Sequence, residues 1–300
     1  MNYNINSGYG QVSAGNLPFG VTGKLFVVGK SGLAYRDAYN DTFSPDPEGK
    51  VRFFSTLTAA IAACTSNAGD QILVLPGHTE TITSAGGVAV NVAGVNIIGL
   101  GTGTSRPTYT FTTAVGASFN VSAANVYIKN LLFVCGINNQ TAINNVTATD
   151  VTFDTCEWTI SDGALGAALC ILTAATATRL KVVNSKFVGP AVNGGQTCAA
   201  CIQHEVGTDY VIQNCYFAGK MTQAILNVAT VLRGLIDNNR FVIGTGTVAI
   251  TMAAASTPFI TNNVINVPSG TAPVTAAAGF VGGNSYSAAA GVTAGAAKTF

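Results

Sequence analysis

Residue types that bind metals gather in one segment of the chain, CAACIQH, which holds Cys198, Cys201 and His204. Cysteine and histidine at such spacings form half of a zinc site, and a complete site needs a second pair. The chain offers no second cysteine pair of the right form. On a strand, a spacing of three residues would also point Cys198 and Cys201 to opposite faces. We therefore interpret these cysteines as packed thiols and expect neither a metal nor another cofactor.

Candidates for acid–base chemistry are also few. In the segment PGHTET, His78 and Glu80 lie two residues apart and so on one face of an extended chain. They could exchange a proton with a substrate, or they could order a turn at the start of the fold, which we favour. The glycines of GLGTGTSRP, residues 99–107, precede no helix, which excludes a dinucleotide site. Two histidines do not complete a serine–histidine–acid arrangement, so no catalytic residue is predicted.

The chain is organised by an internal repeat. LKVVNSKFVG, from Leu180, and YVIQNCYFAG, from Tyr210, share asparagine at the fifth place, an aromatic residue at the eighth and glycine at the tenth. The pattern recurs over 126–134, 151–159, 180–188, 210–218, 234–242 and 258–266, at intervals of 24 to 30 residues. Apolar residues alternate within each copy, and a second strand-like segment lies between copies, with no helical pattern. This predicts an all-β parallel β-solenoid in which each repeat is one coil.

Three columns of residues then lie over one another from coil to coil. The fifth position forms a predicted structural ladder of Asn130, Thr155, Asn184, Asn214, Asn238 and Asn262. The eighth position forms a predicted aromatic stack of Phe133, Trp158, Phe187, Phe217 and Phe241. An outward column of alternating sign forms a predicted charge ladder of Asp150, Arg179, Asp209 and Arg233. Asparagine readily adopts a left-handed backbone at a sharp bend, and its amide can bond its neighbour one coil above.

A solenoid could cleave polysaccharides if carboxylates met on one face. Asp154 and Asp237 share an outward column, but three coils, about 14 Å, would separate them, which is too far for a hydrolytic pair. Asp162 and Glu205 lie in loops that could converge. The chain has only 13 acids, which argues against cleavage as the main function. Because the loop acids could still converge, cleavage is kept as the alternative function.

Segments outside the repeats suggest a cap and two arms. In STLTAAIAAC, Ser55 or Thr56 can begin a helix with one apolar face, which would cover the open end of the solenoid. We divide the chain into an N-terminal arm or attachment element (1–50), a capping helix (51–68), a parallel β-helix (69–268) and an Ala/Gly-rich C-terminal arm (269–300).

Composition limits the classes of partner. The 300-residue chain is 48% hydrophobic and 9% charged, against roughly 25% charged in an average domain, which suggests surface buried against partners. Its net charge of +1 indicates no nucleic acid and no anionic membrane as partner. No apolar run is long enough for a membrane span, and seven cysteines without a secretory signal indicate buried thiols.

These features together resemble a known family. The cap STLTAAIAAC, the segment GDQILVLPGHTETI and the irregular coils are similar to right-handed parallel β-helix repeat proteins of tailed bacteriophage virions, over about residues 24–268. The resemblance implies a single-stranded right-handed parallel β-helix with a short N-terminal capping helix. It also implies a homotrimer in the virion, folded in the host cytoplasm, as a head decoration protein, fibre or tailspike.

From this resemblance we expect a non-enzymatic virion structural protein, a trimeric capsid decoration or cement protein or a short head fibre. Its N- and C-terminal arms would bind the major capsid protein or another virion protein. The alternative is a tailspike-like receptor-binding protein that binds or cleaves a host surface glycan, with Tyr127 and Tyr216 available to stack on sugars.

Overall fold

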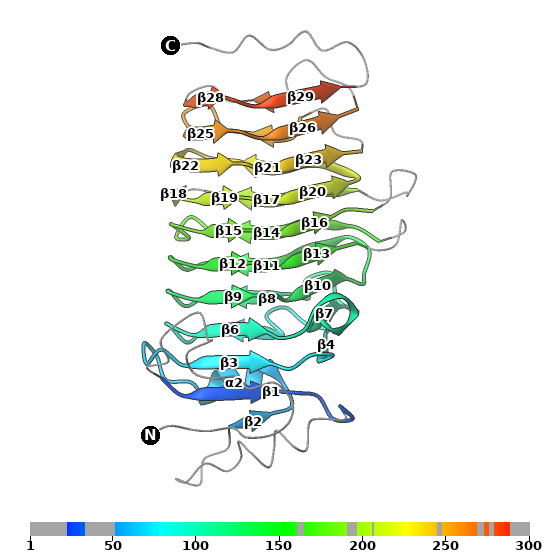
Figure 1. The fold of residues 1–300 in the computed structure, drawn as a ribbon, viewed down its shortest axis with the longest axis vertical. Helices are drawn as coiled ribbons and strands as arrows, with labels where there is room; N and C mark the ends of the chain where they lie inside the picture. Colours follow the sequence, from blue (N-terminus) through cyan, green and yellow to red (C-terminus); the bar gives the residue numbers. More distant parts are fainter. Residues whose placement is uncertain are drawn as a thin grey trace.

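The computed structural model of the chain is a stack of coils built from three parallel β-sheets (Figure 1). The structure describes residues 23–33, 52–160, 165–190, 197–205, 207–244, 248–268, 273–275 and 279–288. Strands of the same sheet lie one above another from the N-terminal to the C-terminal end in Figure 1, and neighbouring strands pair in parallel. The prediction of an all-β, right-handed parallel β-helix is confirmed.

The three sheets are named here A, B and C. Sheet A holds β1 (Leu25–Val28), β2 (Phe53–Phe54), β3 (Gln71–Val74), β6 (Asn96–Gly99), β9 (Tyr127–Lys129), β12 (Thr152–Asp154), β15 (Lys181–Val183), β18 (Gly207–Thr208), β19 (Val211–Gln213), β22 (Val231–Asp237), β25 (Thr257–Thr261) and β28 (Phe280–Gly282). Sheet B holds β4 (Thr79–Ile82), β7 (Thr108–Phe111), β10 (Leu132–Cys135), β13 (Glu157–Thr159), β16 (Lys186–Val188), β20 (Tyr216–Gly219), β23 (Arg240–Ile243), β26 (Val264–Val267) and β29 (Ser285–Ala288). Sheet C holds β5 (Val88–Val90), β8 (Phe119–Val121), β11 (Gln140–Val146), β14 (Ala167–Thr173), β17 (Cys198–His204), β21 (Met221–Asn227), β24 (Ile250–Thr251) and β27 (Val274–Thr275).

Each repeat motif of the sequence contains two strands rather than one. The segment from Val126 to Val134, for example, forms β9 in sheet A and β10 in sheet B, with a sharp corner at Asn130 between them. Asn130 has a φ of 56°, in the left-handed region that asparagine tolerates better than most residues. The strand-like segments between the motifs form sheet C, so a coil has three strands.

Apolar side chains from all three sheets fill the centre of the stack. In sheet A the inward column runs through Ile97, Ile128, Phe153, Val182, Ile212, Ile236 and Ile260, all without measurable exposure. Register is exact along this column, since Phe153 pairs with Ile128 below and Val182 above. A shift of one residue would expose this column, which explains why the repeat is strictly kept within strands while its loops vary in length.

A short helix closes the N-terminal end of the stack. Helix α2 (Leu57–Ala63) buries Leu57 and Ile61 against the first coils, and the hydroxyl of Thr56 accepts a hydrogen bond from its first turn. A further turn, η2 (Gly103–Ser105), is of the 3₁₀ type. In the described part of the chain, no helix has the length and apolarity needed to cross a bilayer.

The solenoid extends beyond the boundaries expected from the sequence. Strand β1 lies within residues 1–50 but pairs with β3 over four residues, so sheet A begins before residue 69. Strands β27, β28 and β29 lie after residue 268 and continue sheets C, A and B. Residues 1–22 and 34–50 of the first expected arm, and residues 269–272, 276–278 and 289–300 of the second, lie outside the described residues.

Candidate functional site

The predicted structural ladder lies at the corner between sheets A and B. All six of its residues have φ between 53° and 57°. Asn214 donates to Oδ1 of Asn184 at 3.3 Å, and Asn238 donates to Oδ1 of Asn214 at 2.8 Å. Asn184 and Asn262 instead reach the carboxylates of Asp154 and Asp237. The ladder therefore satisfies polar groups at a bend that would otherwise leave them without partners.

A second asparagine ladder, absent from our sequence-based prediction, lies one residue further on and faces the core. Asn239 accepts from the backbone N–H of Cys215 at 2.8 Å, and Asn263 and Asn284 repeat this contact one and two coils higher. The Nδ2 atom of Asn239 also donates to the carbonyl of Ile212 at 2.9 Å. The pairs Asn238–Asn239 and Asn262–Asn263 in the sequence were the available signal.

The predicted charge ladder forms two separate ion pairs. The guanidinium of Arg179 donates twice to Asp150, at 2.6 and 2.5 Å, and that of Arg233 donates twice to Asp209, at 2.7 and 2.8 Å. The four residues also have positive φ, so this column is a second left-handed corner, which the sequence pattern did not reveal. Hydrogen bonds from the paired arginines lower the pKa of both aspartates.

Among the described residues, a group of ionisable side chains in mutual contact lies across the corner between sheets A and B at Thr155. We call it the corner cluster and define it as Arg106, Tyr127, Lys129, Asp154, Glu157 and Lys186. On the sheet A side, Asp154 accepts from the hydroxyl of Tyr127 at 2.5 Å and lies 3.5 Å from Nζ of Lys129. Asn184 and Thr155 donate to its other oxygen.

These contacts hold the Asp154 carboxylate in its charged form. Partial burial raises the pKa of Asp154, but the hydrogen bonds and the charge of Lys129 outweigh burial and the pKa lies below its ordinary value. Burial, together with the hydrogen bond to Asp154, raises the pKa of the Tyr127 phenol. At neutral pH this pair is therefore a phenol donating to a carboxylate.

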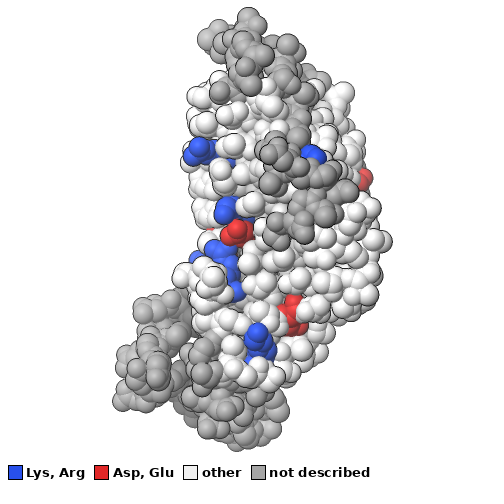
Figure 2. Space-filling model, turned by 90° about the vertical axis from the view of Figure 1, so that its right-hand side faces the viewer, with Lys and Arg blue, Asp and Glu red and all other residues white. Residues whose placement is uncertain are grey.

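On the sheet B side, Glu157 lies between two cations. Arg106 donates to one oxygen at 3.0 Å and Lys186 to the other at 3.3 Å. In the same column, on the two coils after Lys186, the guanidinium of Arg240 lies 5.8 Å from the ring centre of Tyr216. Figure 2 shows the side of the molecule toward which sheet B lies; charge is sparse there, and a negative group lies between positive groups near the middle of the face. The expected neighbours, Glu157 with Lys186 and Tyr216 with Arg240, are confirmed.

The two carboxylates weighed from the sequence, Asp154 and Asp237, do not contact each other. Register places Asp154 and Asp237 in one outward column with Val183 and Gln213 between them, as the spacing predicts. Asp237 is instead bonded by Gln213 and Thr261, at 2.9 and 2.8 Å. Asp162 lies outside the described residues, so its convergence with Glu205 stays a prediction.

His78 and Glu80 have a structural role. The buried His78 lies 2.8 Å from Glu80 through Nε2 and Oε1, and the same oxygen accepts from the backbone N–H of Leu57 at 2.7 Å. Leu57 begins helix α2, whose first N–H groups have no partner within the helix. The hydrogen bond from Leu57 to Glu80, with His78 on the same oxygen, therefore connects the capping helix to the first coils.

The argument that Cys198 and Cys201 point to opposite faces is wrong. Both are in the main core, with 0% and 1% exposure. Inward and outward side chains do not alternate strictly along β17. Ala200 packs in a separate small cluster, whereas Cys201 and Ile202, although consecutive, both pack in the main core. His204 is apart from these thiols, because its ring lies against Tyr210, at 4.5 Å, and its Nδ1 against Thr173. Burial lowers the pKa of His204 to about 4.

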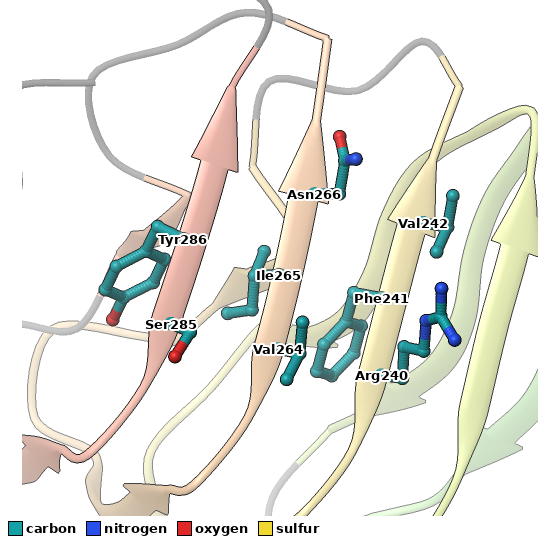
Figure 3. A pocket seen from close by; sticks show the side chains of 8 residues that line it. All are labelled: Arg240, Phe241, Val242, Val264, Ile265, Asn266, Ser285 and Tyr286. Atoms are coloured by element: carbon teal, nitrogen blue, oxygen red, sulfur yellow. The ribbon is translucent and has the colours of Figure 1, made fainter.

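A shallow depression of about 220 Å³ lies on sheet B near the C-terminal end (Figure 3). Its lining is Arg240, Phe241, Val242, Val264, Ile265, Asn266, Ser285 and Tyr286. Phe241 and Ile265 are fully buried in the core, and the lining contains no acid. The depression is therefore poorly suited to acid–base chemistry, and the corner cluster remains the better candidate site.

Comparisons with known proteins place the chain among β-helix proteins. No family model and no curated protein sequence matches it. Among solved structures it is similar to pectate lyase Pel9A, with a TM-score of 0.58 and 14% identity over 91% of this chain and 78% of that one. It is also similar to a rhamnogalacturonan lyase, with a TM-score of 0.50 and 14% identity over 88% and 73% of the two chains. This likeness defines the chain as a parallel β-helix protein.

The expected function is corrected by these findings. The resemblance to phage proteins led us to expect a non-enzymatic virion structural protein, but two solved structures that share the fold over most of this chain are a pectate lyase and a rhamnogalacturonan lyase. The solenoid and its ladders are equally compatible with a scaffold that positions reacting groups, so neither supports the structural role in particular.

Proposed function

We propose that this protein binds a uronate-containing polysaccharide at the corner cluster and cleaves it. The observation that carries the proposal is the cluster itself, in which a phenol and three cationic side chains contact two carboxylates on either side of the corner between sheets A and B. The sharing of the fold with a pectate lyase and a rhamnogalacturonan lyase supports it. Arginine and lysine are the side chains that bind carboxylates of an acidic chain.

The cluster favours β-elimination over hydrolysis. Hydrolysis by a carboxyl pair needs one carboxyl group to stay protonated and act as an acid. The contacts of Asp154 lower its pKa and keep it charged, which is the wrong state for that role. In β-elimination a base takes the proton next to the uronate carboxyl group, the bond to the neighbouring sugar oxygen breaks, and a carbon–carbon double bond forms while that oxygen gains a proton.

Each part of the cluster has a place in such a reaction. Arg106 and Lys186, whose side chains are 19% and 48% exposed, could bind the substrate carboxylate and stabilise the charge that develops on it. The charged Asp154 carboxylate is the group that could take the proton next to the uronate carboxyl group. Lys129 and Tyr127, which both contact Asp154 and carry a proton, could deliver a proton to the leaving sugar oxygen.

Activity on a panel of polysaccharides tests the proposal. The protein is incubated with polygalacturonate, alginate and a glucuronate-containing bacterial capsule, and the ultraviolet absorbance of the double bond conjugated to the product carboxylate is followed. Turnover on at least one polymer is expected, with kcat/KM falling on the order of 10²-fold in Lys129→Met and in Arg106→Gln. Arg233→Gln is the matched control, because it removes an arginine from an exposed ion pair outside the cluster.

Absence of turnover together with absence of binding in affinity electrophoresis across the panel would refute the proposal. Binding without turnover, lost in Arg106→Gln and kept in Arg233→Gln, would refute cleavage and retain glycan binding. The resemblance to phage β-helix proteins supports a host surface glycan as substrate, and a homotrimer within a virion stays a prediction.

A further inference from the structure

Four sulfur atoms meet in the core beneath sheet C. They belong to Cys170 on β14, Cys198 and Cys201 on β17, and Met221 on β21, which we call the sulfur cluster. The three thiol sulfurs all lie within 4.8 Å of one another, and those of Cys170 and Cys198 are 4.0 Å apart. The thiol of Cys201 also lies 3.6 Å from the thioether sulfur of Met221. Each of the four residues is at most 3% exposed.

The spacing of the thiols matches that of ligands around a single cation. Metal–thiolate bonds are about 2.3 Å long, so three sulfurs around one trigonal cation lie about 4 Å apart. Cys170 and Cys198 already have this separation. The other pairs need to close by less than about 1 Å, which side-chain rotation supplies without moving the paired strands.

The donor set selects the kind of cation. All the donors are sulfur, and the nearest histidine on β17, His204, is bonded to Thr173 instead. Thiolate and thioether ligands select soft cations, above all Cu(I), whereas imidazole and carboxylate ligands suit zinc and harder metals. A cation there would also offset the charge that deprotonated thiols would otherwise place in an apolar interior.

From these distances we propose that the sulfur cluster is a buried binding site for one soft cation, with Cu(I) as the best fit and Met221 as an axial ligand. The ligands come from three successive coils. Metal–sulfur bonds would therefore link β14, β17 and β21, in addition to the backbone hydrogen bonds between these strands. Its enclosure means that the cation enters while the chain folds. This site is independent of the polysaccharide chemistry proposed for the corner cluster.

Copper analysis of the whole protein tests the site. The chain is produced in copper-supplemented cells, purified without oxygen and treated with a chromophoric Cu(I) chelator, and the retained copper is measured by mass spectrometry. One equivalent per chain is expected in the wild type and none in Cys198→Ala. Cys215→Ala is the matched control, because Cys215 is equally buried but lies outside the cluster, and it is expected to retain the copper.

A second measurement uses wild type alone, so that it stays informative if a cysteine variant does not fold. The copper-loaded wild type is expected to melt at a higher temperature than wild type produced without copper, as binding to the native state alone requires. Two results would overturn the proposal. One is a wild type that releases all of its copper to the chelator with unchanged melting. The other is an oxidised Cys170–Cys198 pair, seen as five rather than seven free thiols in the unfolded chain.

Discussion

Removing the ring of Phe217 is expected to destabilise the solenoid more than any change on its surface. The ring is fully buried and lies between two parallel rings in the aromatic stack. Its centre is 4.7 Å from that of Phe187, at an angle of 4°, and 4.8 Å from that of Phe241, at 8°. Trp158 continues the stack at 4.5 Å from Phe187.

The magnitude follows from two losses. Replacing a buried phenylalanine by alanine costs about 3–5 kcal/mol, because the site closes only in part around the cavity. Each lost ring pair adds about 0.5–1.5 kcal/mol beyond buried area. The hydrogen-bonded strands above and below hold their spacing, so little collapse is available, and Phe217→Ala should lie near the top of that range, at about 5 kcal/mol.

Equilibrium unfolding in urea measures this cost. Trp158 is the one tryptophan of the chain and belongs to the same stack, so its fluorescence reports on this part of the core. Phe259→Ala removes the same ring from a surface position that is 55% exposed and is the matched control. Equal free energies of unfolding for the two variants, or a loss below about 1 kcal/mol in Phe217→Ala, would show that the stacked rings do not support the coil stack.

Three further changes probe the ladders and the buried histidine. Asn214→Ala should cost about 1–2 kcal/mol in chemical unfolding, since it removes one ladder donor and one acceptor and leaves alanine at a φ of 56°; Asn214→Gly, which tolerates that φ, should cost less, and the reverse order would contradict the turn argument. Because burial lowers the pKa of His204 to about 4 and the unfolded chain titrates near 6.5, stability should be full above about pH 6.5 and fall by about 3 kcal/mol as the pH drops toward 4. The difference in stability between wild type and His204→Gln should carry this slope between pH 4 and 6.5, and a flat difference would refute it. Arg233→Gln should lower the melting temperature only slightly, and by less in high salt; a salt-independent loss would contradict a screened surface pair.

Most of the architecture follows from spacing along the chain. Residues 24 to 30 positions apart with the same pattern lie directly above one another, and Asn184, Asn214 and Asn238 are in one file. The sequence predicted the bend at the asparagine, but each motif was still read as one strand because apolar alternation continues on both sides of the corner. The early start of sheet A at β1 was missed because a single strand carries no repeat.

The candidate site was predicted only in its parts. Contacts between equivalent positions, such as Glu157 with Lys186, follow from the repeat. The contacts of Arg106 with Glu157 and of Tyr127 with Asp154 join positions that are not equivalent, so no column pairs them. The sulfur cluster was missed for a different reason, because the assumption of strict alternation fails inside β17.

The sequence by itself therefore determined the repeat, the fold class and the identity of neighbours along each column, because parallel in-register pairing brings like positions together. The tertiary structure alone decided what meets across a corner or through the core. Those contacts depend on how the chain continues after a corner and on where inward and outward side chains stop alternating along a strand. Packing against the neighbouring coils sets both, and the types of the residues that come into contact do not reveal it.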